Sequence, residues 1–438
     1  MRVKSFHGGV HPPENKHRTE SKAIEALPIP KKLVIPMQQH TGAPCDPLVK
    51  EGDEVKAGQK IGESKAAVSA AVHSGICGRV TAVARLPHPS IGRPVLSVVV
   101  EGEGDPGSWT SVADWKSMDV PEIRRRIQEA GVVGMGGAAF PTHVKLSPPP
   151  DKKVEALILN GVECEPYLTC DHRLMVERGA DILEGARILM KVLGIQRAYL
   201  GIEGNKPDAI RLMTDLCRKG SLPVEVVPLK VKYPQGAEKQ LIKSILNREV
   251  PSGGLPIDVG AVVQNVGTAL AVYEAVALSK PLIERVLTVS GDGVKEARNL
   301  RVRIGTLFSE VLAACGTVAG ADVKVLMGGP MMGLAQYTTD VPVVKGTSGI
   351  LVLSKGAHQE KDTTCIKCGR CVEICPMGLM PNRIADYAEK DNFAMTEKFD
   401  VRDCIECGAC GYICDAKRPM VHLIKYAKLN LAKPAKKA

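Results

Sequence analysis

The chain has 438 residues, of which 44% are apolar and 24% charged, so it is long enough for about three or four domains with sizeable cores. Only 3% of the residues are aromatic, which argues against a nucleic-acid-binding protein because single-stranded binding depends on aromatic stacking. The net charge of +10 suits anionic nucleotides, an acidic redox partner or the cytoplasmic leaflet of a membrane, but equally a solvated surface with a lysine-rich tail.

The sequence contains no typical leader or membrane span. The first 20 residues are polar and lack the apolar stretch of a signal peptide. The best candidate span, residues 259–278, carries Gln264, Asn265, Tyr273 and Glu274 near its middle, and these side chains are costly in hydrocarbon. We therefore expect a buried strand and a helix there, and a protein that faces the cytosol and reaches a membrane only through partners.

In chain order, an N-terminal extension (1–32) precedes a region of short predicted strands separated by glycine turns (33–104). Residues 49–66 resemble a biotinyl/lipoyl-type barrel-sandwich domain. Lys65 stands where such domains present a modified lysine on a hairpin. Ser64 replaces the acidic residue that usually comes before that lysine, which favours an unmodified side chain.

Residues 118–280 alternate between helical and strand patterns, which is typical of an α/β domain with a parallel sheet. We expect strands at 154–159, 198–202, 224–228 and 259–264, and helices at 181–193 and 207–217. Residues 283–354 are again strand-rich, with a hairpin turn at 290–293. A cysteine-rich region (358–427) with a helix at 382–390 follows, and a basic tail (428–438) ends the chain.

Two nearly identical runs, each Cys-x2-Cys-x2-Cys-x3-Cys, begin at Cys365 and Cys404 and use eight of the 14 cysteines. Four thiolates within one short run suit a cuboidal [4Fe–4S] cluster, whereas a structural zinc usually takes two separated Cys-x2-Cys pairs. The sequence therefore predicts two [4Fe–4S] clusters rather than zinc or disulfides. It also predicts a reducing compartment, in which the other six cysteines stay free.

In two-cluster ferredoxin folds, the fourth cysteine of each run ligates the other cluster. We therefore predict two mixed ligand sets: Cys365, Cys368, Cys371 and Cys414 for one cluster, and Cys404, Cys407, Cys410 and Cys375 for the other. Clusters that share ligand loops lie close together, so this region is expected to pass single electrons.

A glycine-rich loop at 131–137 exposes backbone N–H groups that can approach a phosphate, and Lys145 adds a positive charge nearby. The loop precedes a strand, so it does not fit the strand-first fingerprint of dinucleotide folds, and a simple turn is the alternative. The next strand ends in Asn160, Glu163 and Glu165, at the edge where open α/β sheets bind ligands. The two acids are either a solvated turn or groups that hydrogen-bond a ribose or a carboxamide.

Four segments resemble, in order, the flavin-carrying, NADH-oxidising subunit of respiratory complex I: the glycine loop with residues 140–145, the strand end at 160–166, the turn at 233–238 and the segment 264–268. With the Gly-, His- and Pro-rich opening at 7–13, the barrel-like region and the doubled cysteine run, residues 5–420 resemble the C subunits of Rnf ion-translocating electron-transport complexes. Met135, Val162 and Gln264 depart from the complex I pattern, which has an arginine, an aspartate and an asparagine at these positions.

The resemblance implies a Rossmann-like α/β core, a β-grasp domain (283–354) and an α-helical ferredoxin-like domain with two [4Fe–4S] clusters. It implies that FMN is held by one set of residues: Gly134, Gly136, Gly137, Lys145, Asn160, Glu163, Tyr233, Gly236, Asn265 and Thr268. It places NADH above the flavin, near Phe140, Glu165 and Glu238.

The function implied is that of a peripheral electron-input subunit of a membrane-bound, ion-translocating NADH:ferredoxin oxidoreductase. Electrons would pass between NADH, FMN and the two clusters, and no side chain is expected to be catalytic because cofactors carry the hydride and the electrons. The implied partners are a ferredoxin-like iron–sulfur subunit and integral membrane subunits, at the cytoplasmic face of the cell membrane.

Two alternatives are kept. One is a soluble flavin and iron–sulfur cobalamin reductase, which shares the flavin fold and the clusters but is disfavoured by the opening at 7–13. The other is a non-enzymatic electron-relay or docking module with working clusters and a degenerate nucleotide fold.

Overall fold

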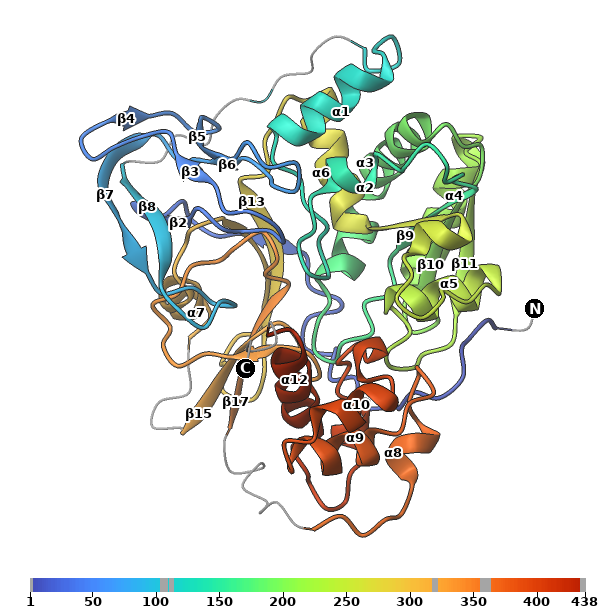
Figure 1. Cartoon of the computed structure of the whole chain (residues 1–438). Helices are drawn as coiled ribbons and strands as arrows, with labels where there is room; N and C mark the ends of the chain where they lie inside the picture. Colours follow the sequence, from blue (N-terminus) through green and yellow to red (C-terminus); the bar gives the residue numbers. More distant parts are fainter. Residues whose placement is uncertain (1–2, 103–108, 110–113, 317–321, 355–363, 434–438) are drawn as a thin grey trace.

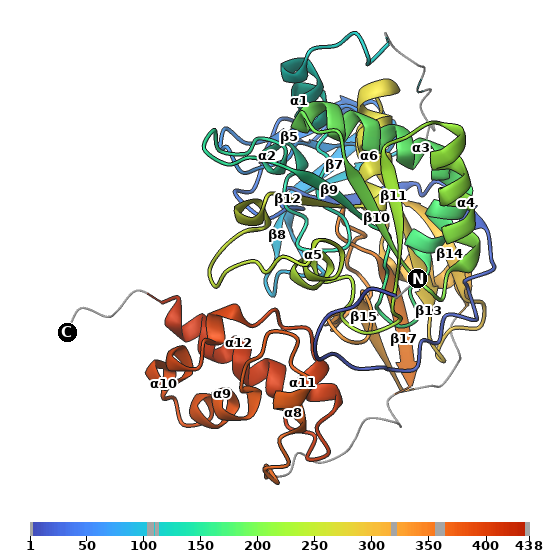
Figure 2. The ribbon, with the colours of Figure 1, turned by 90° about the vertical axis from the view of Figure 1, so that its right-hand side faces the viewer.

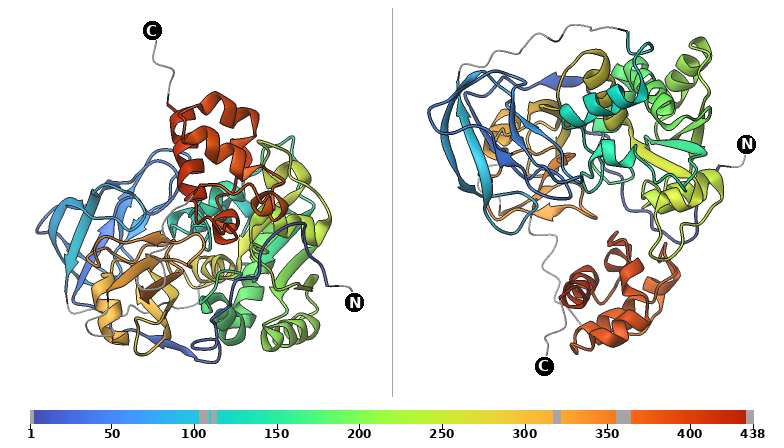
Figure 3. Two further views of the ribbon diagram at one scale, coloured as in Figure 1. Left: turned by 90° about the horizontal axis from the view of Figure 1, so that it is seen from below. Right: turned by 45° about the horizontal axis from the view of Figure 1, so that its top comes forward.

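The structure is a computed structural model that describes residues 3–102, 109, 114–316, 322–354 and 364–433. Figure 1 shows a barrel-like region (blue), an α/β region (green to yellow) and a β-rich region (orange) side by side, with a helical C-terminal region (red) below them. Figure 3 shows that this helical region projects from one side of the rest of the molecule. No described helix is both long and apolar enough to cross a lipid bilayer.

The barrel-like region consists of two small antiparallel sheets, with strand orders β2-β8-β7-β4 and β3-β5-β6. Leu33 and Ile35 are fully buried and pack in its core with Ile61, Val98 and Val100. The strands are β2 (Lys32–Pro36), β3 (Asp46–Pro47), β4 (Glu54–Val55), β5 (Lys60–Glu63), β6 (Val72–His73), β7 (Gly78–Leu86) and β8 (Val95–Glu101). The predicted region of short strands is thus confirmed as a barrel-sandwich.

The α/β region has a parallel sheet in the order β11-β10-β9-β12. Leu157 and Leu159 face the core that contains α1, α3, α4 and α6, whereas Ile158 faces α5 on the opposite side. The strands are β9 (Ala156–Asn160), β10 (Ala198–Glu203), β11 (Val224–Leu229) and β12 (Ala261–Asn265). The helices are α1 (Val120–Glu129), α2 (Thr142–Lys145), α3 (Cys170–Leu193), α4 (Pro207–Lys219), α5 (Glu238–Leu246) and α6 (Val266–Ala277), with a 3-10 turn at Pro256–Val259. The predicted α/β fold is confirmed.

One helix of this region was predicted too short. Helix α3 begins at Cys170 rather than at Asp181, and its backbone leaves helical geometry at Arg178, with φ −127° and ψ 25°. The prediction therefore covers only the second half of α3. The first half is mostly polar in sequence, but Leu174 and Met175 are buried in the core, so tertiary packing extends the helix.

The β-rich region is a six-stranded sheet in the order β1-β14-β13-β17-β15-β16, packed against α7. Its elements are β13 (Glu284–Ser290), β14 (Arg298–Arg303), α7 (Phe308–Cys315), β15 (Val323–Met327), β16 (Leu334–Ala335) and β17 (Gly349–Ser354), and the N-terminal extension adds β1 (Ile24–Ala26). Strands β13 and β14 form the predicted hairpin, but their pairing ends at Val289–Arg298. The turn predicted at 290–293 is therefore only the first half of a longer connection.

The C-terminal region is helical, with α9 and α12 packed around Ile384, Ala385, Ile424 and Ala427. Its helices are α8 (Arg370–Glu373), α9 (Pro381–Ala388), α10 (Phe393–Lys398), α11 (Ala409–Tyr412) and α12 (Met420–Leu431), with a 3-10 turn at Val401–Asp403. In Figure 2 the N-terminal segment (dark blue) runs along the boundary between this region and the rest of the molecule. There Val10 pairs with Tyr233, and Gly9 N donates to Ile374 O at 2.7 Å.

Candidate functional site

Two contacts hold the glycine loop in place: one to a side chain of α6 and one between the two ends of the loop. The amide of Met135 donates to Thr268 Oγ1 at 2.8 Å, and Gly134 N donates to Phe140 O at 2.8 Å. Asn265 caps α6, because its Oδ1 accepts from Gly267 N at 2.8 Å. Fixed in this way, residues 136–138 remain exposed and can meet a ligand with their backbone.

Two glycines leave room for that approach. Gly136 has φ +77°, and a Cβ built on it would lie 3.0 Å from Asn265 Nδ2. No described atom lies within 4 Å of a Cβ built on Gly137. A side chain at either position would occupy space that a bound phosphate or flavin ring needs, so the loop fits the predicted cofactor.

The loop lies beside the point where the sheet changes direction. The chain proceeds from β9 to β10 and β11 on one side and then returns to β12 on the other side of β9. Asn160 and Asn265 end β9 and β12 as register partners. Ligands of open α/β sheets bind outside the carboxyl ends of strands at such a switch point.

Side chains at these strand ends bring several predicted residues together. Asn160 Nδ2 donates to Gly236 O at 2.8 Å, and Asn265 Nδ2 donates to Asp171 Oδ2 at 2.6 Å. Lys145 Nζ, at the end of α2, lies 2.5 Å from Glu238 Oε1, at the start of α5. The structure thus gathers most of the predicted FMN set around the glycine loop and the two strand ends.

Glu163 has a role that its sequence position did not indicate. Its Oε1 and Oε2 accept from the amides of Asp171 (2.8 Å) and His172 (3.1 Å) at the N-terminus of α3. The helix dipole favours a carboxylate there. Asp171 itself is buried, and burial together with the Glu163 charge raises the pKa of its carboxyl.

Two residues near this site were not found from the sequence. Asp171 lies in the part of α3 that the prediction missed. Arg285 is a buried residue on β13, and its Nη1 lies 2.5 Å from Met135 Sδ. It therefore brings a guanidinium next to the position where complex I has an arginine in the loop, but from another region of the chain, so no local pattern could reveal it.

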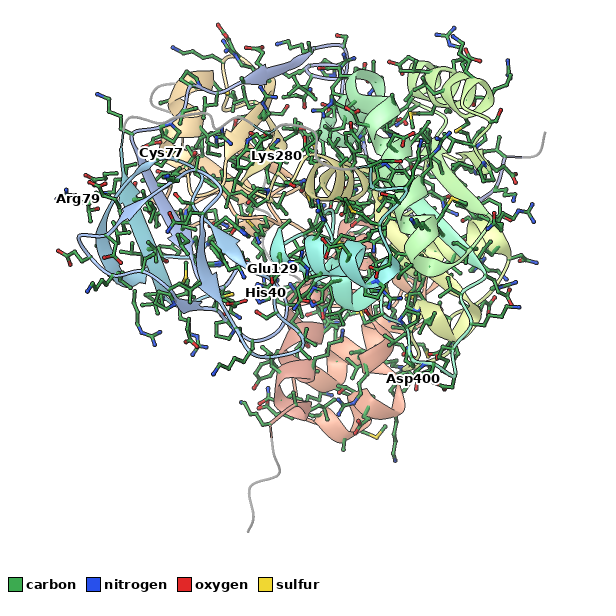
Figure 4. The ribbon with its side chains drawn as sticks, turned by 90° about the horizontal axis from the view of Figure 1, so that it is seen from above. His40, Cys77, Arg79, Glu129, Lys280 and Asp400 are labelled. Carbon is green, nitrogen blue, oxygen red and sulfur yellow. The ribbon has the colours of Figure 1, made fainter. Side chains whose placement is uncertain are left out.

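The barrel-like region also contacts the glycine loop. Thr41 Oγ1 donates to Ala138 O at 2.6 Å, and Thr41 N donates to Ala139 O at 3.2 Å. Figure 4 shows His40, next to this contact, where the barrel meets the α/β region near Glu129 at the end of α1. Lys65 is exposed on the connection between β5 and β6.

Tyr233 and Glu165 contact the two regions that follow the α/β region in the chain, the helical C-terminal region and the β-rich region. The buried Tyr233 hydroxyl donates to Cys407 O at 2.7 Å. Glu165 accepts from Met331 N at 3.1 Å and from Met332 N at 2.9 Å. Loss of solvent around the carboxyl raises the pKa of Glu165 to about 7. Phe140, another residue near the predicted NADH position, is 36% exposed.

The eight motif cysteines line two cavities, four in each. The outer set is Cys365, Cys368, Cys371 and Cys414, and the inner set is Cys375, Cys404, Cys407 and Cys410. Each set takes three cysteines from one run and the fourth from the other. Four thiols around one enclosed space form a donor set that fits a [4Fe–4S] cluster.

The two cysteine loops repeat one backbone conformation. Lys367 and Glu406 have φ of +57° and +56°, and Gly369 and Gly408 have φ of +78° and +81°. In each loop an amide, that of Lys367 or Glu406, lies 3.4 Å from the first cysteine's Sγ and donates to it. Such N–H groups stabilise charge on the sulfur and tune the potential of a bound cluster.

The two sets differ in their surroundings. Three of the four inner cysteines are buried, whereas Cys368 of the outer set is exposed and its neighbour Ile366 is 63% exposed. The inner set lies against the α/β region, where Tyr233 contacts Cys407 and Gln240 Nε2 donates to Pro376 O at 3.0 Å.

Comparison with protein families divides the chain into four parts. Residues 4–105 match the RnfC barrel sandwich hybrid domain, 127–274 the Nuo51 FMN-binding domain, 286–335 the SLBB domain and 358–415 the 4Fe-4S dicluster domain. These matches cover the glycine loop, the strand ends and the cysteine runs described above.

Curated relatives match nearly the whole chain. The C subunit of the proton-translocating ferredoxin:NAD(+) oxidoreductase complex of Clostridium ljungdahlii is 49% identical, over 97% of this chain and 94% of the relative. The C subunit of the Na(+)-translocating complex of Acetobacterium woodii is 46% identical, over 98% of both chains. Among solved structures, an NAD+-reducing [NiFe]-hydrogenase in its H2-reduced state aligns with a TM-score of 0.51 and 17% identity, over 74% of this chain and 65% of that one, which indicates a shared fold.

Proposed function

The chain belongs to the family of C subunits of ion-translocating ferredoxin:NAD(+) oxidoreductase complexes, and we propose that electrons pass between NADH and iron–sulfur centres within this subunit. The observation that carries the proposal is the bond between Tyr233 and Cys407. It joins a turn of the FMN-binding domain directly to a ligand loop of the inner cysteine set.

FMN supplies the conversion between two-electron hydride transfer and one-electron transfer. The exposed backbone of Gly136 and Gly137, with Lys145 nearby, would bind its phosphate. Asn160, Asn265 and Thr268 would keep the loop and the strand ends in place through the hydrogen bonds that they form.

The different burial of the two cysteine sets supports an order of electron transfer. The inner set is adjacent to the FMN-binding domain, and the outer set reaches the surface at Cys368. We therefore place the inner centre next to the flavin and the outer centre next to a partner. That partner would be a ferredoxin-like iron–sulfur subunit, in a complex attached peripherally, through integral membrane subunits, to the cytoplasmic face of the membrane.

The relatives favour this function over a cobalamin reductase, because the relatives described above are C subunits of ferredoxin:NAD(+) oxidoreductases and match over almost their whole length. A non-enzymatic relay is disfavoured because the FMN-binding domain matches over residues 127–274 and its glycine loop is open.

Anaerobic reconstitution followed by titration with NADH tests the proposal. We expect about eight irons and about one FMN per chain, bleaching of the flavin band by NADH, and EPR signals from two reduced clusters. Protein that binds iron but no flavin would instead support the relay module. Rapid NADH-dependent reduction of cob(III)alamin would support the reductase.

A further inference from the structure

The turn at 328–333, with the sequence Gly-Gly-Pro-Met-Met-Gly, is built around the Glu165 carboxylate. Two consecutive amides, Met331 N and Met332 N, donate to its two oxygens at 3.1 Å and 2.9 Å. A Cβ on Gly329 would lie 2.2 Å from Glu165 Oε2, so only glycine allows the carboxylate so close to the backbone.

The other side of the same turn meets the inner cysteine loop. Gly408, which follows Cys407, is so close to the turn that a Cβ there would lie 2.6 Å from Met331 O. Met331 also packs in the small apolar cluster that contains Tyr233, Cys407 and Ala409. The turn is therefore held between the strand end of the α/β region and the ligand loop of the inner centre.

We propose that Glu165 and the 328–333 turn form a latch that fixes the inner ligand loop against the FMN-binding domain. Glu165 is then a positioning residue for electron transfer to the inner centre, and not a contact of the nicotinamide. The inference rests on the proposed function, because a latch affects electron transfer only if electrons take this route.

The geometry explains why a further attachment matters. The Tyr233 bond holds the inner loop at Cys407 O, and Ser252 Oγ donates to Asp403 Oδ2, directly before Cys404, at 2.6 Å. The latch adds a contact at Gly408, the residue after Cys407. Electron-transfer rates fall steeply with distance, so small movements of this loop change the rate.

The test uses the reconstituted full chain and three variants. Glu165→Ala removes both acceptors, Glu165→Gln keeps the shape of the side chain with one acceptor oxygen, and Met332→Ala removes an exposed side chain of the turn but leaves its amide. Hydrogen exchange at the Met331 and Met332 amides should accelerate about tenfold or more in Glu165→Ala, less in Glu165→Gln and not in Met332→Ala.

Kinetics separate positioning from substrate binding. NADH oxidation with ferricyanide, which takes electrons from the flavin, should keep its KM in both Glu165 variants, while reduction of the inner centre by NADH slows about tenfold. A raised KM with unchanged amide exchange and unchanged cluster reduction would overturn the latch and restore the nicotinamide contact. If the unmodified chain fails to transfer electrons from NADH to its clusters, the proposed function is wrong. The hydrogen-exchange rates of the Met331 and Met332 amides still test the latch in that case, because they do not depend on electron transfer.

Discussion

The phenol of Tyr233 donates a 2.7 Å hydrogen bond to the backbone carbonyl of Cys407. Tyr233 precedes α5 in the FMN-binding domain, and Cys407 belongs to the inner cysteine set. The resemblance to complex I assigned Tyr233 to the flavin. The structure shows that its hydroxyl is already bonded on the other side, so the residue physically links the two redox regions.

Replacing Tyr233 by Phe removes this donor and leaves the Cys407 carbonyl without it. The bond is present in both redox states, and only the difference in its strength between them changes the potential. The potential should therefore fall by at most about 40 mV, the one-electron equivalent of about 1 kcal/mol. An EPR-monitored redox titration should show this shift for the inner centre alone. Tyr337→Phe, at an exposed position, is the matched control, and an equal shift of both centres would contradict the assignment.

Gly8 is expected to be intolerant of a side chain. It has φ +75°, and a Cβ on it would lie 2.8 Å from Ile374 O and 2.9 Å from Cys375 O. Gly8→Ala should therefore displace the Cys375 loop and reduce iron content from about eight towards about four per chain. Gly52→Ala is the control. Gly52 has φ +92°, but no described atom lies within 4 Å of a Cβ built on it. This variant should therefore lose only about 1 kcal/mol of stability, which comes from placing alanine in a backbone conformation suited to glycine, without a clash. Equal iron loss in both variants would rule out a specific clash.

The mixed ligand sets can be separated with two serine substitutions. Cys375→Ser should remove the inner centre, whose other three ligands come from the second run. Cys414→Ser should remove the outer centre, whose other three ligands come from the first run. Each variant should keep about four irons and one EPR signal, and only Cys375→Ser should abolish the signal of the buried inner centre. If Cys375→Ser instead removes the exposed outer centre, each run binds its own cluster.

The sequence was most informative where the ligands are local. The cysteine spacing, together with the exchange of the fourth ligand in two-cluster ferredoxin folds, predicted the two groups of four, because each loop supplies three ligands over seven residues. The pattern of strands and helices likewise placed Asn160 at a ligand-binding strand end, and the structure adds Asn265 as its register partner on the neighbouring strand. The fold class is confirmed, and the FMN and NADH contacts stay predictions.

The sequence was least informative where distant regions meet. The partners of Glu165 are backbone amides of a turn 166 and 167 residues away, and Arg285 comes from the neighbouring sheet. Backbone donors leave no signature in side-chain composition, and packing between regions has no periodicity to detect. The turn at 328–333 was therefore visible as a motif but had no interpretation until its contacts were known.

Lys345 makes stability depend on pH. Its buried Nζ donates to Ala71 O at 2.6 Å and to Gly131 O at 2.7 Å, which joins the barrel to the α/β region. Burial lowers the pKa of Lys345 to about 7. Above that pH the unfolded chain binds a proton at this lysine that the folded chain does not, so the free energy of unfolding rises as pH increases from about 7 towards about 10.5.

The comparison of wild type with Lys345→Met isolates this effect. The melting temperature of the wild type relative to the variant should rise between about pH 7 and about pH 9 and stay level below about pH 7. His40 and His73 lie nearby, but burial lowers the pKa of each, to about 4 and about 3, so both stay neutral over this range. Burial likewise raises the pKa of the Cys45 thiol. A difference that falls as pH rises would show that Lys345 is not the titrating group.

Lys145 tests the phosphate end of the flavin site. Its ammonium lies 2.5 Å from Glu238 Oε1, and both side chains are partly exposed, so the pair is available to a bound anion. Lys145→Ala should weaken FMN binding about tenfold, equivalent to about 1.4 kcal/mol, because a charge-assisted contact to phosphate is lost. Glu238→Ala is the matched variant: it removes the competing carboxylate, and FMN affinity should stay the same or rise.

Flavin fluorescence quenching measures the FMN affinity of both variants. Their iron content should not change, since neither residue contacts the cysteine sets. Equal loss of FMN and iron in Lys145→Ala would mean that the lysine acts through folding.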